Sequence, residues 1–532
     1  MNIGQVRHRD GTGAAGVEPY QTWAWRDGMD RIIDSIASGG PRPDHKITFY
    51  QDDGVVSYTL SDLDALACAL AMRLRGLGVE AGDRIGILSR NRLEWILLDL
   101  AAIKLKVITA GFDYNHFTPG ADLIEAYGLK LIFTDRETDL PGIVDIRTLA
   151  AGRETDGGGD FSAHYADDDV TTIKFTSGST GQPKGLGATV GSIQSSLAAA
   201  QSLFRHGASD TLFVFLPLSL LQQRYGVYSA LHYGHDVVVT TYELAFYAMK
   251  RERPTVIMGV PSFFDAVRKQ VESKLRGAGR DDLEERRRRA DDILGGRIRY
   301  LWTGSAPASP SMLHFFHDCG IPIFEGYGMN ETCIVTKNYE GNCKIGSAGK
   351  ALPGKEVVVG DGGMIIVRSR YPVNRRYMYC APGESEKIFT PEGDVITGDI
   401  GHVDEDGYLF ITGRADDVIA LGNGRNVPVR PIEEQVRNCG AVGECVLFGA
   451  GRAFLMAVVS KSSDTADEGE IAAHIETVNR TLDKDERIGK FIVAKSRFTI
   501  ENGLLTSQYK PRRKEILKMY QAEINGAYGG KS

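Results

Sequence analysis

Several signatures of common enzyme classes are missing from this sequence of 532 residues. It contains no HExxH pair, no CxxC pair and no Gly-x-Ser-x-Gly elbow, so metalloprotease, zinc-site and serine-hydrolase chemistry have no support. The 7 cysteines are odd in number and lack metal-ligand spacing, which indicates free thiols in a reducing compartment. No apolar run is long enough to span a membrane, and the N-terminus lacks the apolar region of a signal peptide. We therefore expect a cytoplasmic protein without an integral membrane segment.

An excess of positive charge is also missing. The formal net charge is −7, which disfavours a nucleic-acid partner. Hydrophobic residues make up 42% and charged residues 25% of the chain, which is typical of a globular protein. A chain of this length is too long for one ordinary core, so we expect two or more domains.

Helical and strand patterns alternate through much of the chain. Strand patterns at 84–88, 107–110 and 131–134 are separated by helical patterns at 63–77, 92–104 and 121–127, after a hairpin at 46–60. Such alternation predicts an α/β fold in which helices cover parallel-rich sheets. Residues 415–532 contain a hairpin at 444–459 and a helix at 471–482, typical of a small α+β domain. We expect a large N-terminal domain over 1–414 and a small mobile domain over 415–532.

The most informative stretch runs from Thr176 to Gly185 and reads Thr-Ser-Gly-Ser-Thr-Gly-Gln-Pro-Lys-Gly. A strand pattern at 171–175 precedes it and a helical pattern at 192–204 follows, which predicts a strand, a glycine-rich loop and a helix. Glycines let backbone N–H groups approach a polyphosphate, and Lys184 supplies a positive charge. The expected phosphate-binding residues before this lysine are Thr176, Ser177, Gly178, Ser179, Thr180 and Gly181. The stretch is not a Walker A motif, because Pro183 stands where that motif has glycine.

This stretch resembles the phosphate loop of the acyl-adenylate-forming superfamily, which includes acyl-CoA synthetases, luciferases and adenylation domains of peptide synthetases. Further motifs extend the resemblance over most of the chain. They are Gly304-Ser305-Ala306-Pro307, Glu325-Gly326-Tyr327-Gly328-Met329-Asn330-Glu331-Thr332, Thr397-Gly398-Asp399 with Gly413-Arg414, Gly422 to Val427, and Leu504 to Lys514. The last of these resembles the form found in long-chain fatty acyl-CoA synthetases.

The resemblance implies a role for each matching residue. Tyr327 would lie against adenine, and Glu331 would hold the Mg²⁺ that bridges the phosphates, which suits the preference of a hard cation for carboxylate and phosphate oxygens. Asp399 and Arg414 would bind the ribose. Lys510 would bridge the substrate carboxylate and the α-phosphate. The remaining expected nucleotide-binding positions are Gly304, Ser305, Ala306, Glu325, Gly326, Gly328 and Asn330.

The resemblance also predicts how the second half-reaction is organised. Asp416 occupies the position of a hinge about which the small domain would rotate, and Gly424 lies in a loop that would then approach the pantetheine arm of coenzyme A. The acid pocket would draw on Tyr225, Gly226 and Gly259. The implied reaction activates a large apolar carboxylic acid with ATP as an acyl-adenylate and then transfers the acyl group to coenzyme A.

Four positions depart from the family pattern. Asn330 stands where a Thr or Ser is usual, Val190 where a His is frequent, and Leu220 and Gln223 where fatty acyl relatives commonly carry His and Glu. Three hypotheses therefore stay open. The first is a complete ligase. The second is a ligase that only transfers a preformed acyl-adenylate to coenzyme A, with a partner enzyme performing adenylation, for instance in natural-product (terpenoid) biosynthesis. The third is a non-catalytic acyl- or nucleotide-binding protein, which Glu331, Asp399, Arg414 and Lys510 together disfavour.

Overall fold

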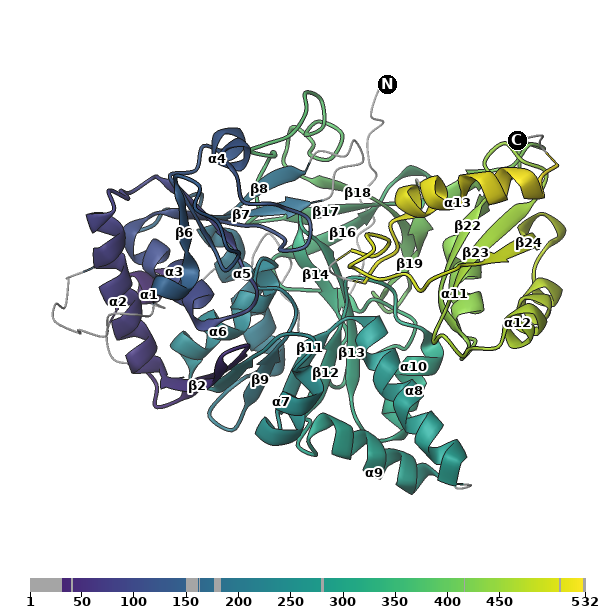
Figure 1. The fold of residues 1–532 in the computed structure, drawn as a ribbon, viewed down its shortest axis with the longest axis horizontal. Helices are drawn as coiled ribbons and strands as arrows, with labels where there is room; N and C mark the ends of the chain where they lie inside the picture. The colour runs from purple at the N-terminus through teal and green to yellow at the C-terminus, as the bar shows by residue number, and fades with distance from the viewer. Residues whose placement is uncertain are drawn as a thin grey trace.

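The structure is a computed structural model that describes residues 31–39, 42–149, 161, 163–176, 183–278, 282–415, 417–506 and 509–529. Its element order alternates helices and strands over the first part of the chain, and the C-terminal elements gather at one end of the molecule, far from α1 to α3 (Figure 1). The fold is mixed α/β with parallel-rich sheets, as the alternating patterns predict.

One sheet has six strands and leads into the phosphate loop. Its order is β6 (Ile143–Asp145), β5 (Leu131–Thr134), β3 (Arg84–Leu88), β4 (Ile108–Gly111), β7 (Val170–Thr176) and β8 (Lys184–Thr189). All neighbours are parallel except β7 and β8. The accompanying helices are α2 (Leu60–Gly76), α3 (Leu93–Leu105), α4 (Ala121–Tyr127) and the 3₁₀ turn η1 (Ile146–Leu149). Every residue of α3 is buried, because this helix is mainly apolar on all sides.

The second sheet has nine strands. Its order is β15 (Lys350–Ala351), β14 (Cys333–Lys337), β13 (Ile323–Met329), β12 (Tyr300–Thr303), β11 (Val256–Gly259), β9 (Thr211–Val214), β10 (Asp236–Val239), β1 (Lys46–Gln51) and β2 (Gly54–Thr59). The strands from β13 to β1 are parallel, and both ends of the sheet are antiparallel. The helices of this region are α1 (Ile32–Ser38), α5 (Val190–Phe204), α6 (Leu221–Tyr233), α7 (Ala245–Glu252), α8 (Pro261–Ala278), α9 (Leu283–Leu294) and α10 (Pro310–Asp318).

The remaining elements form three smaller sheets. An antiparallel sheet contains β16 (Lys355–Val359), β17 (Met364–Ser369), β18 (Val395–Val403) and β19 (Leu409–Arg414), with the turn η2 (Asp361–Gly363). The C-terminal part contains the pair β20 (Val418–Ala420) and β21 (Asn426–Pro428) and a sheet of β22 (Val442–Phe448), β23 (Leu455–Lys461) and β24 (Ile488–Val493). Its helices are α11 (Arg430–Arg437), α12 (Glu468–Thr481) and α13 (Arg513–Ala527), with the turn η3 (Lys484–Glu486).

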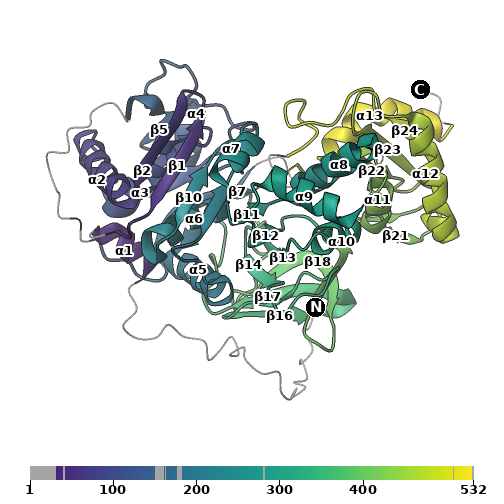
Figure 2. The same ribbon diagram turned by 90° about the horizontal axis from the view of Figure 1, so that it is seen from below.

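Separate apolar cores support the two parts of the chain. The largest core joins α1, α2, α3, α5 and α6 to strands of the two large sheets, and it contains the fully buried Trp95. The C-terminal part has cores of its own on both faces of β22 and β23. Figure 2 shows α8 and α10 on the side that faces the C-terminal elements. The division at residue 414 stays a prediction, although β19 ends there and β20 begins at Val418.

Most expected elements are present. The predicted order of strand, phosphate loop and helix is wrong, because a second strand lies between the loop and the helix. The hairpin at 46–60, the alternating elements from 60 to 134 and the C-terminal hairpin and α12 are all found. Between the loop and α5, however, the chain forms β8, which pairs with β7 and places Lys184 directly opposite Thr176. The loop therefore closes a β-hairpin and does not lead straight into a helix. The sequence did not predict β8, because residues 184–189 contain two glycines and have little strand propensity of their own.

Two further expectations concern the whole chain. All seven cysteines are free in the structure, as their spacing predicts. Within the described ranges, every helix is too short or too polar to span a lipid bilayer.

Candidate active site

The phosphate-loop lysine is held by a carboxylate from a distant segment. The loop residues Ser177, Gly178, Ser179, Thr180 and Gly181 lie outside the described residues, whereas Thr176 and Lys184 form the base of the hairpin. The Lys184 Nζ lies 2.6 Å from Glu384 Oε2. This ion pair, together with Lys387, lowers the pKa of Glu384 to about 2. Glu384 therefore stays ionised at every physiological pH and neutralises the cation of the loop.

Glu331, the expected Mg²⁺ ligand, is buried and is bonded to a tyrosine that also lies beneath Lys184. It lies in the turn between β13 and β14, and the Tyr377 hydroxyl donates a hydrogen bond to its Oε1 at 2.5 Å. The Lys184 ammonium lies 5.2 Å from the centre of the Tyr377 ring. Burial, and then the charge of Glu331, raise the pKa of Tyr377 well above its ordinary value, so its hydroxyl stays protonated. Tyr377 thus connects the expected phosphate-binding lysine to the expected metal carboxylate.

Glu331 is the carboxylate expected to bind a Mg²⁺ ion shared with phosphates. No group of three or more His, Cys, Asp and Glu side chains converges as a metal site among the residues described. A cation at Glu331 would complete its shell with phosphate oxygens and water, which is the coordination that Mg²⁺ prefers.

The expected ribose residues Asp399 and Arg414 lie together, and Tyr327, expected to lie against adenine, is bonded to Asp399. The Tyr327 hydroxyl donates to Asp399 Oδ2 at 2.6 Å, and Arg414 Nη1 lies 3.2 Å from Asp399 Oδ1. Gly398 has a φ of 75°, and a Cβ there would lie 3.0 Å from the Arg414 guanidinium, so glycine permits this close approach. Burial raises the pKa of Asp399, while the Tyr327 hydroxyl and Arg414 oppose that shift. The strand pairing of β18 with β19 sets Asp399 opposite Arg414.

Lys510 is brought to the same cluster from the C-terminal part. Burial lowers its pKa to about 8, and the nearby Arg430 and Arg414 add to the effect while Asp399 opposes it. The backbone of Lys510 is fixed because its N–H donates to the Thr506 hydroxyl at 3.1 Å. Its neighbour Tyr509 packs on Tyr242 of the N-terminal part with ring centres 4.6 Å apart. The structure therefore holds the C-terminal part with Lys510 directed at the expected nucleotide site.

Residues expected around the base lie at the carboxyl ends of β12 and β13. Gly304, Ser305 and Ala306 follow β12, where ligands of parallel sheets commonly bind. A Cβ at Gly304 would lie 3.1 Å from the Gly326 carbonyl oxygen, so the two strand ends pack closely. Gly328 sits at a bulge of β13, where a Cβ would overlap the Cys333 carbonyl. Glu325 accepts from the Ala308 N–H at 2.9 Å, and burial raises its pKa to about 8.

The expected acid-pocket residues come from α6 and β11. Tyr225 is buried, and its hydroxyl lies 3.2 Å from the Cys333 sulfur. Gly226 faces β9, since its Cβ would lie 3.3 Å from Val214, and Gly259 packs against Phe264.

Three of the positions that depart from the family pattern pack in the interior or against it: Val190 and Gln223 are buried, and Leu220 packs at the start of α6. The Gln223 Oε1 has no hydrogen-bond partner in the described part of the chain.

The turn expected to bind coenzyme A packs within the C-terminal part. Asp416, the expected hinge, lies outside the described residues. Gly424 forms a tight turn with a φ of 81° between β20 and β21. Its neighbour Asn423 bonds to Asp485, and the Gly422 N–H donates to Arg452, so this turn packs within the C-terminal part.

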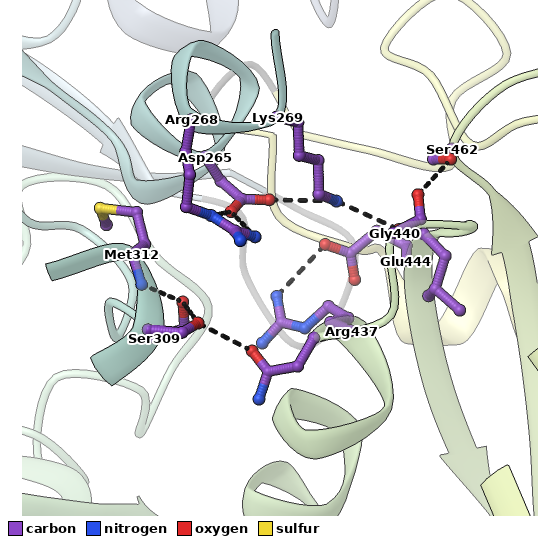
Figure 3. Close-up of polar contacts among 12 residues, drawn as sticks. Asp265, Arg268, Lys269, Ser309, Met312, Arg437, Gly440, Glu444 and Ser462 are labelled. Carbon is purple, nitrogen blue, oxygen red and sulfur yellow. Dashed lines mark hydrogen bonds and ion pairs between the residues drawn. The ribbon is translucent and has the colours of Figure 1, made fainter. Parts of the chain in front are cut away.

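Polar contacts join the two parts of the chain along α8 and α10 (Figure 3). The Lys269 Nζ lies 3.1 Å from Asp265 and donates to the Val442 carbonyl at 3.4 Å. Glu444 accepts a hydrogen bond from Arg437 at 3.3 Å. Burial raises the pKa of Glu444, while the charges of Arg437 and Lys269 act to lower it. Ser311 donates to Asn438 at 3.4 Å. These contacts fix the orientation that presents Lys510.

Two site residues were missed by sequence reasoning. Tyr377 and Glu384 come from an irregular segment between β17 and β18, which has no periodic pattern and no motif. A tyrosine and a glutamate in a turn-rich segment carry no local signal of their role, because their partners Glu331 and Lys184 are distant in sequence.

Comparison with known proteins places this geometry in a family. A model described as AMP-binding enzyme matches residues 38–369, and one described as AMP-binding enzyme C-terminal domain matches residues 416–532. The chain therefore belongs to the AMP-binding enzyme family.

Its homologues are acyl-CoA ligases. The chain is 28% identical to the long-chain-fatty-acid–CoA ligase FadD15 of Mycobacterium bovis, over 91% of this chain and 95% of the relative. It is also 28% identical to the 2-succinylbenzoate–CoA ligase of Bacillus pumilus, over 76% and 82%.

Solved structures share the fold at lower identity. The adenylation domain of a carboxylate reductase from Mycobacterium chelonae superposes with a TM-score of 0.79 at 20% identity, covering 95% of this chain and 92% of that chain. The O-succinylbenzoate coenzyme A synthetase of Bacillus subtilis, in complex with AMP, gives 0.73 at 22% identity, covering 92% and 98%.

Proposed function

We propose that the protein is an acyl-CoA ligase that converts a large apolar carboxylic acid and ATP into an acyl-adenylate and then transfers the acyl group to coenzyme A. The observation that carries the proposal is that Lys510, from the C-terminal part, lies close enough to Asp399 and Arg414 for their charges to shift its pKa, while Tyr327 is bonded to the same Asp399. Stability of the C-terminal part does not require one of its lysines to be half-buried beside Asp399 and Arg414 of the N-terminal part. A ligase needs that arrangement, because the lysine must contact both reactants.

In the first half-reaction the protein chiefly binds ATP and the carboxylic acid and orients them toward each other. Asp399 accepts hydrogen bonds from the ribose hydroxyls, with Tyr327 and Arg414 holding its carboxylate in place. Lys510 donates to the carboxylate of the acid and to the α-phosphate, and so neutralises charge as the two oxygens approach. Mg²⁺ at Glu331 would stabilise the departing pyrophosphate. The carboxylate oxygen bonds to the α-phosphorus as the bond to pyrophosphate breaks.

In the second half-reaction the thiol of coenzyme A replaces AMP on the acyl carbon. The C-terminal part would turn about Asp416, so that Lys510 leaves the site and the Gly424 turn approaches it. The relatives named as long-chain fatty acid and 2-succinylbenzoate CoA ligases support this reaction class.

A second candidate, transfer from a preformed adenylate only, is favoured by the Lys184–Glu384 ion pair. In this arrangement the lysine of the phosphate loop already has a counter-ion at 2.6 Å, which competes with ATP phosphates for its charge. Exchange of radiolabelled pyrophosphate into ATP, with a panel of fatty, aryl and terpenoid acids and no coenzyme A, separates the two candidates. Exchange with any acid supports the complete ligase.

A further inference from the structure

Two buried lysines hold the backbone on either side of Glu331. The Lys174 Nζ, from β7, donates to the carbonyl oxygen of Asn330 at 2.6 Å. The Lys355 Nζ, from the start of β16, donates to the carbonyl oxygen of Thr332 at 3.0 Å and to the Ser369 hydroxyl at 2.9 Å. The residue before Glu331 and the residue after it are therefore each fixed by an ammonium group from a different sheet.

These lysines are unusual in the interior of a protein. Lys174 is 2% exposed and Lys355 is 6% exposed, and neither lies within ion-pair distance of a carboxylate that the structure describes. Burial lowers the pKa of both lysines, while the charge of Cys333 acts to raise both and that of Glu331 acts to raise the pKa of Lys174. By contrast, the buried Lys104 lies 2.8 Å from Asp64. Burying an ammonium group that has no carboxylate within ion-pair distance is costly, so stability alone does not explain why two such groups lie beside one turn.

The turn that they hold has a backbone that requires support. Cys333, two residues after Glu331, has a φ of 57°, a left-handed conformation that non-glycine residues adopt rarely. On the other side, β13 is bulged between Tyr327 and Gly328. A carboxylate at the centre of such a turn has no regular helix or sheet to fix its direction.

We propose that Lys174 and Lys355 form a two-lysine clamp that positions Glu331 toward the phosphates of ATP; this deepens the proposed function and rests on it. Lys174 lies two residues before Thr176, at the start of the phosphate loop, so β7 connects the loop to the Glu331 turn through one hydrogen bond. The clamp thereby fixes the distance between the two structures that must hold the same polyphosphate. Both lysines are positioning residues that do not touch the substrate.

The test compares Lys174→Met and Lys355→Met with the unaltered protein. The first readout is hydrogen exchange of the backbone amides of residues 330–333, which the clamp predicts to become at least about tenfold faster in each variant. The second is calorimetric binding of the Mg²⁺ complex of a non-hydrolysable ATP analogue, with an expected loss of affinity of about tenfold. The unfolding midpoint is expected to change little, because the relief from burying an ammonium group offsets the loss of its hydrogen bonds to the turn.

Lys104→Met is the matched control. It removes another buried lysine that donates to a carbonyl, that of Ile36 at 3.0 Å, but it lies outside the site. We expect it to lower the unfolding midpoint and to change neither the exchange at 330–333 nor the affinity for the analogue. Unchanged exchange in both clamp variants would overturn the clamp. If the unaltered protein binds no nucleotide, the proposed function fails, and the exchange alone then decides the clamp.

Discussion

Lys184 and Glu384 form an ion pair of 2.6 Å between the phosphate loop and the irregular segment before β18. The same lysine lies over the ring of Tyr377, whose hydroxyl holds Glu331, so the ion pair stands beside the expected Mg²⁺ carboxylate. Binding of ATP would have to displace Glu384 from Lys184. We therefore predict that the rate of adenylation depends on how readily Glu384 releases Lys184.

Replacing Glu384 with glutamine tests that dependence. Glu384→Gln removes the charge while preserving the size of the side chain, so Lys184 becomes available to the phosphates. We expect the KM for ATP to fall by roughly three- to tenfold, since a charge-assisted hydrogen bond is worth about 1.5–3 kcal/mol and only part of it is recovered. Steady-state kinetics of pyrophosphate release measures the change. Glu386→Gln is the matched control, and a KM that rises in Glu384→Gln contradicts the competition.

The charge of Lys510 predicts a pH profile. Its pKa is lowered to about 8 by burial, with Arg430 and Arg414 adding and Asp399 opposing. Only the ammonium form neutralises the carboxylate and the phosphate, so the adenylation rate is expected to be level below pH 8 and to fall about tenfold per pH unit above it. Pyrophosphate exchange measured from pH 6 to pH 10 gives the profile.

Lys510→Arg separates this effect from general alkaline inactivation. The guanidinium keeps its charge throughout that range, so the fall above pH 8 should disappear even though the rate itself is lower. Retention of the same fall in the arginine variant would show that another group titrates.

Removing the Tyr327 hydroxyl tests whether Tyr327, Asp399 and Arg414 bind the nucleotide. Tyr327→Phe leaves Asp399 with Arg414 as its remaining described side-chain partner, and we expect the KM for ATP to rise about three- to tenfold, corresponding to the loss of about 1 kcal/mol. Transfer from a preformed adenylate should slow to a similar degree, because the adenylate carries the same ribose. The exposed Tyr247→Phe provides the control. Equal KM values in the two variants would remove Tyr327 from the nucleotide site.

The contact between the two parts of the chain is expected to favour the first half-reaction. Lys269→Ala removes the hydrogen bond to the Val442 carbonyl and the nearby charge that opposes the raised pKa of Glu444 (Figure 3). Adenylation should slow by about two- to fivefold, since exposed or half-buried polar contacts contribute about 1 kcal/mol or less. Transfer from a preformed adenylate to coenzyme A should be unaffected or faster. Lys250→Ala, on the exposed side of α7, should change neither rate.

The sequence was sufficient for the fold class, and it named most of the motif residues that the structure brings together, while their roles stay predictions. Helix and strand periods are local, so elements such as α3 and the hairpin of β1 and β2 could be predicted from short windows. The β8 strand could not, because Lys184–Thr189 acquires its structure from pairing with β7. The partners of the motif residues could not be predicted either, because Tyr377, Glu384 and Lys174 contact residues that are far away in sequence.

The most direct measurement runs two assays on the same purified protein. One follows exchange of pyrophosphate into ATP with a panel of carboxylic acids and Mg²⁺ but no coenzyme A, and the other follows thioester formation from synthetic acyl-adenylates and coenzyme A. The account predicts that both proceed with a large apolar acid, and that Lys510→Ala abolishes at least about 99% of the exchange while sparing most of the transfer. Transfer without exchange for every acid, in a protein that still binds ATP, would contradict the complete ligase.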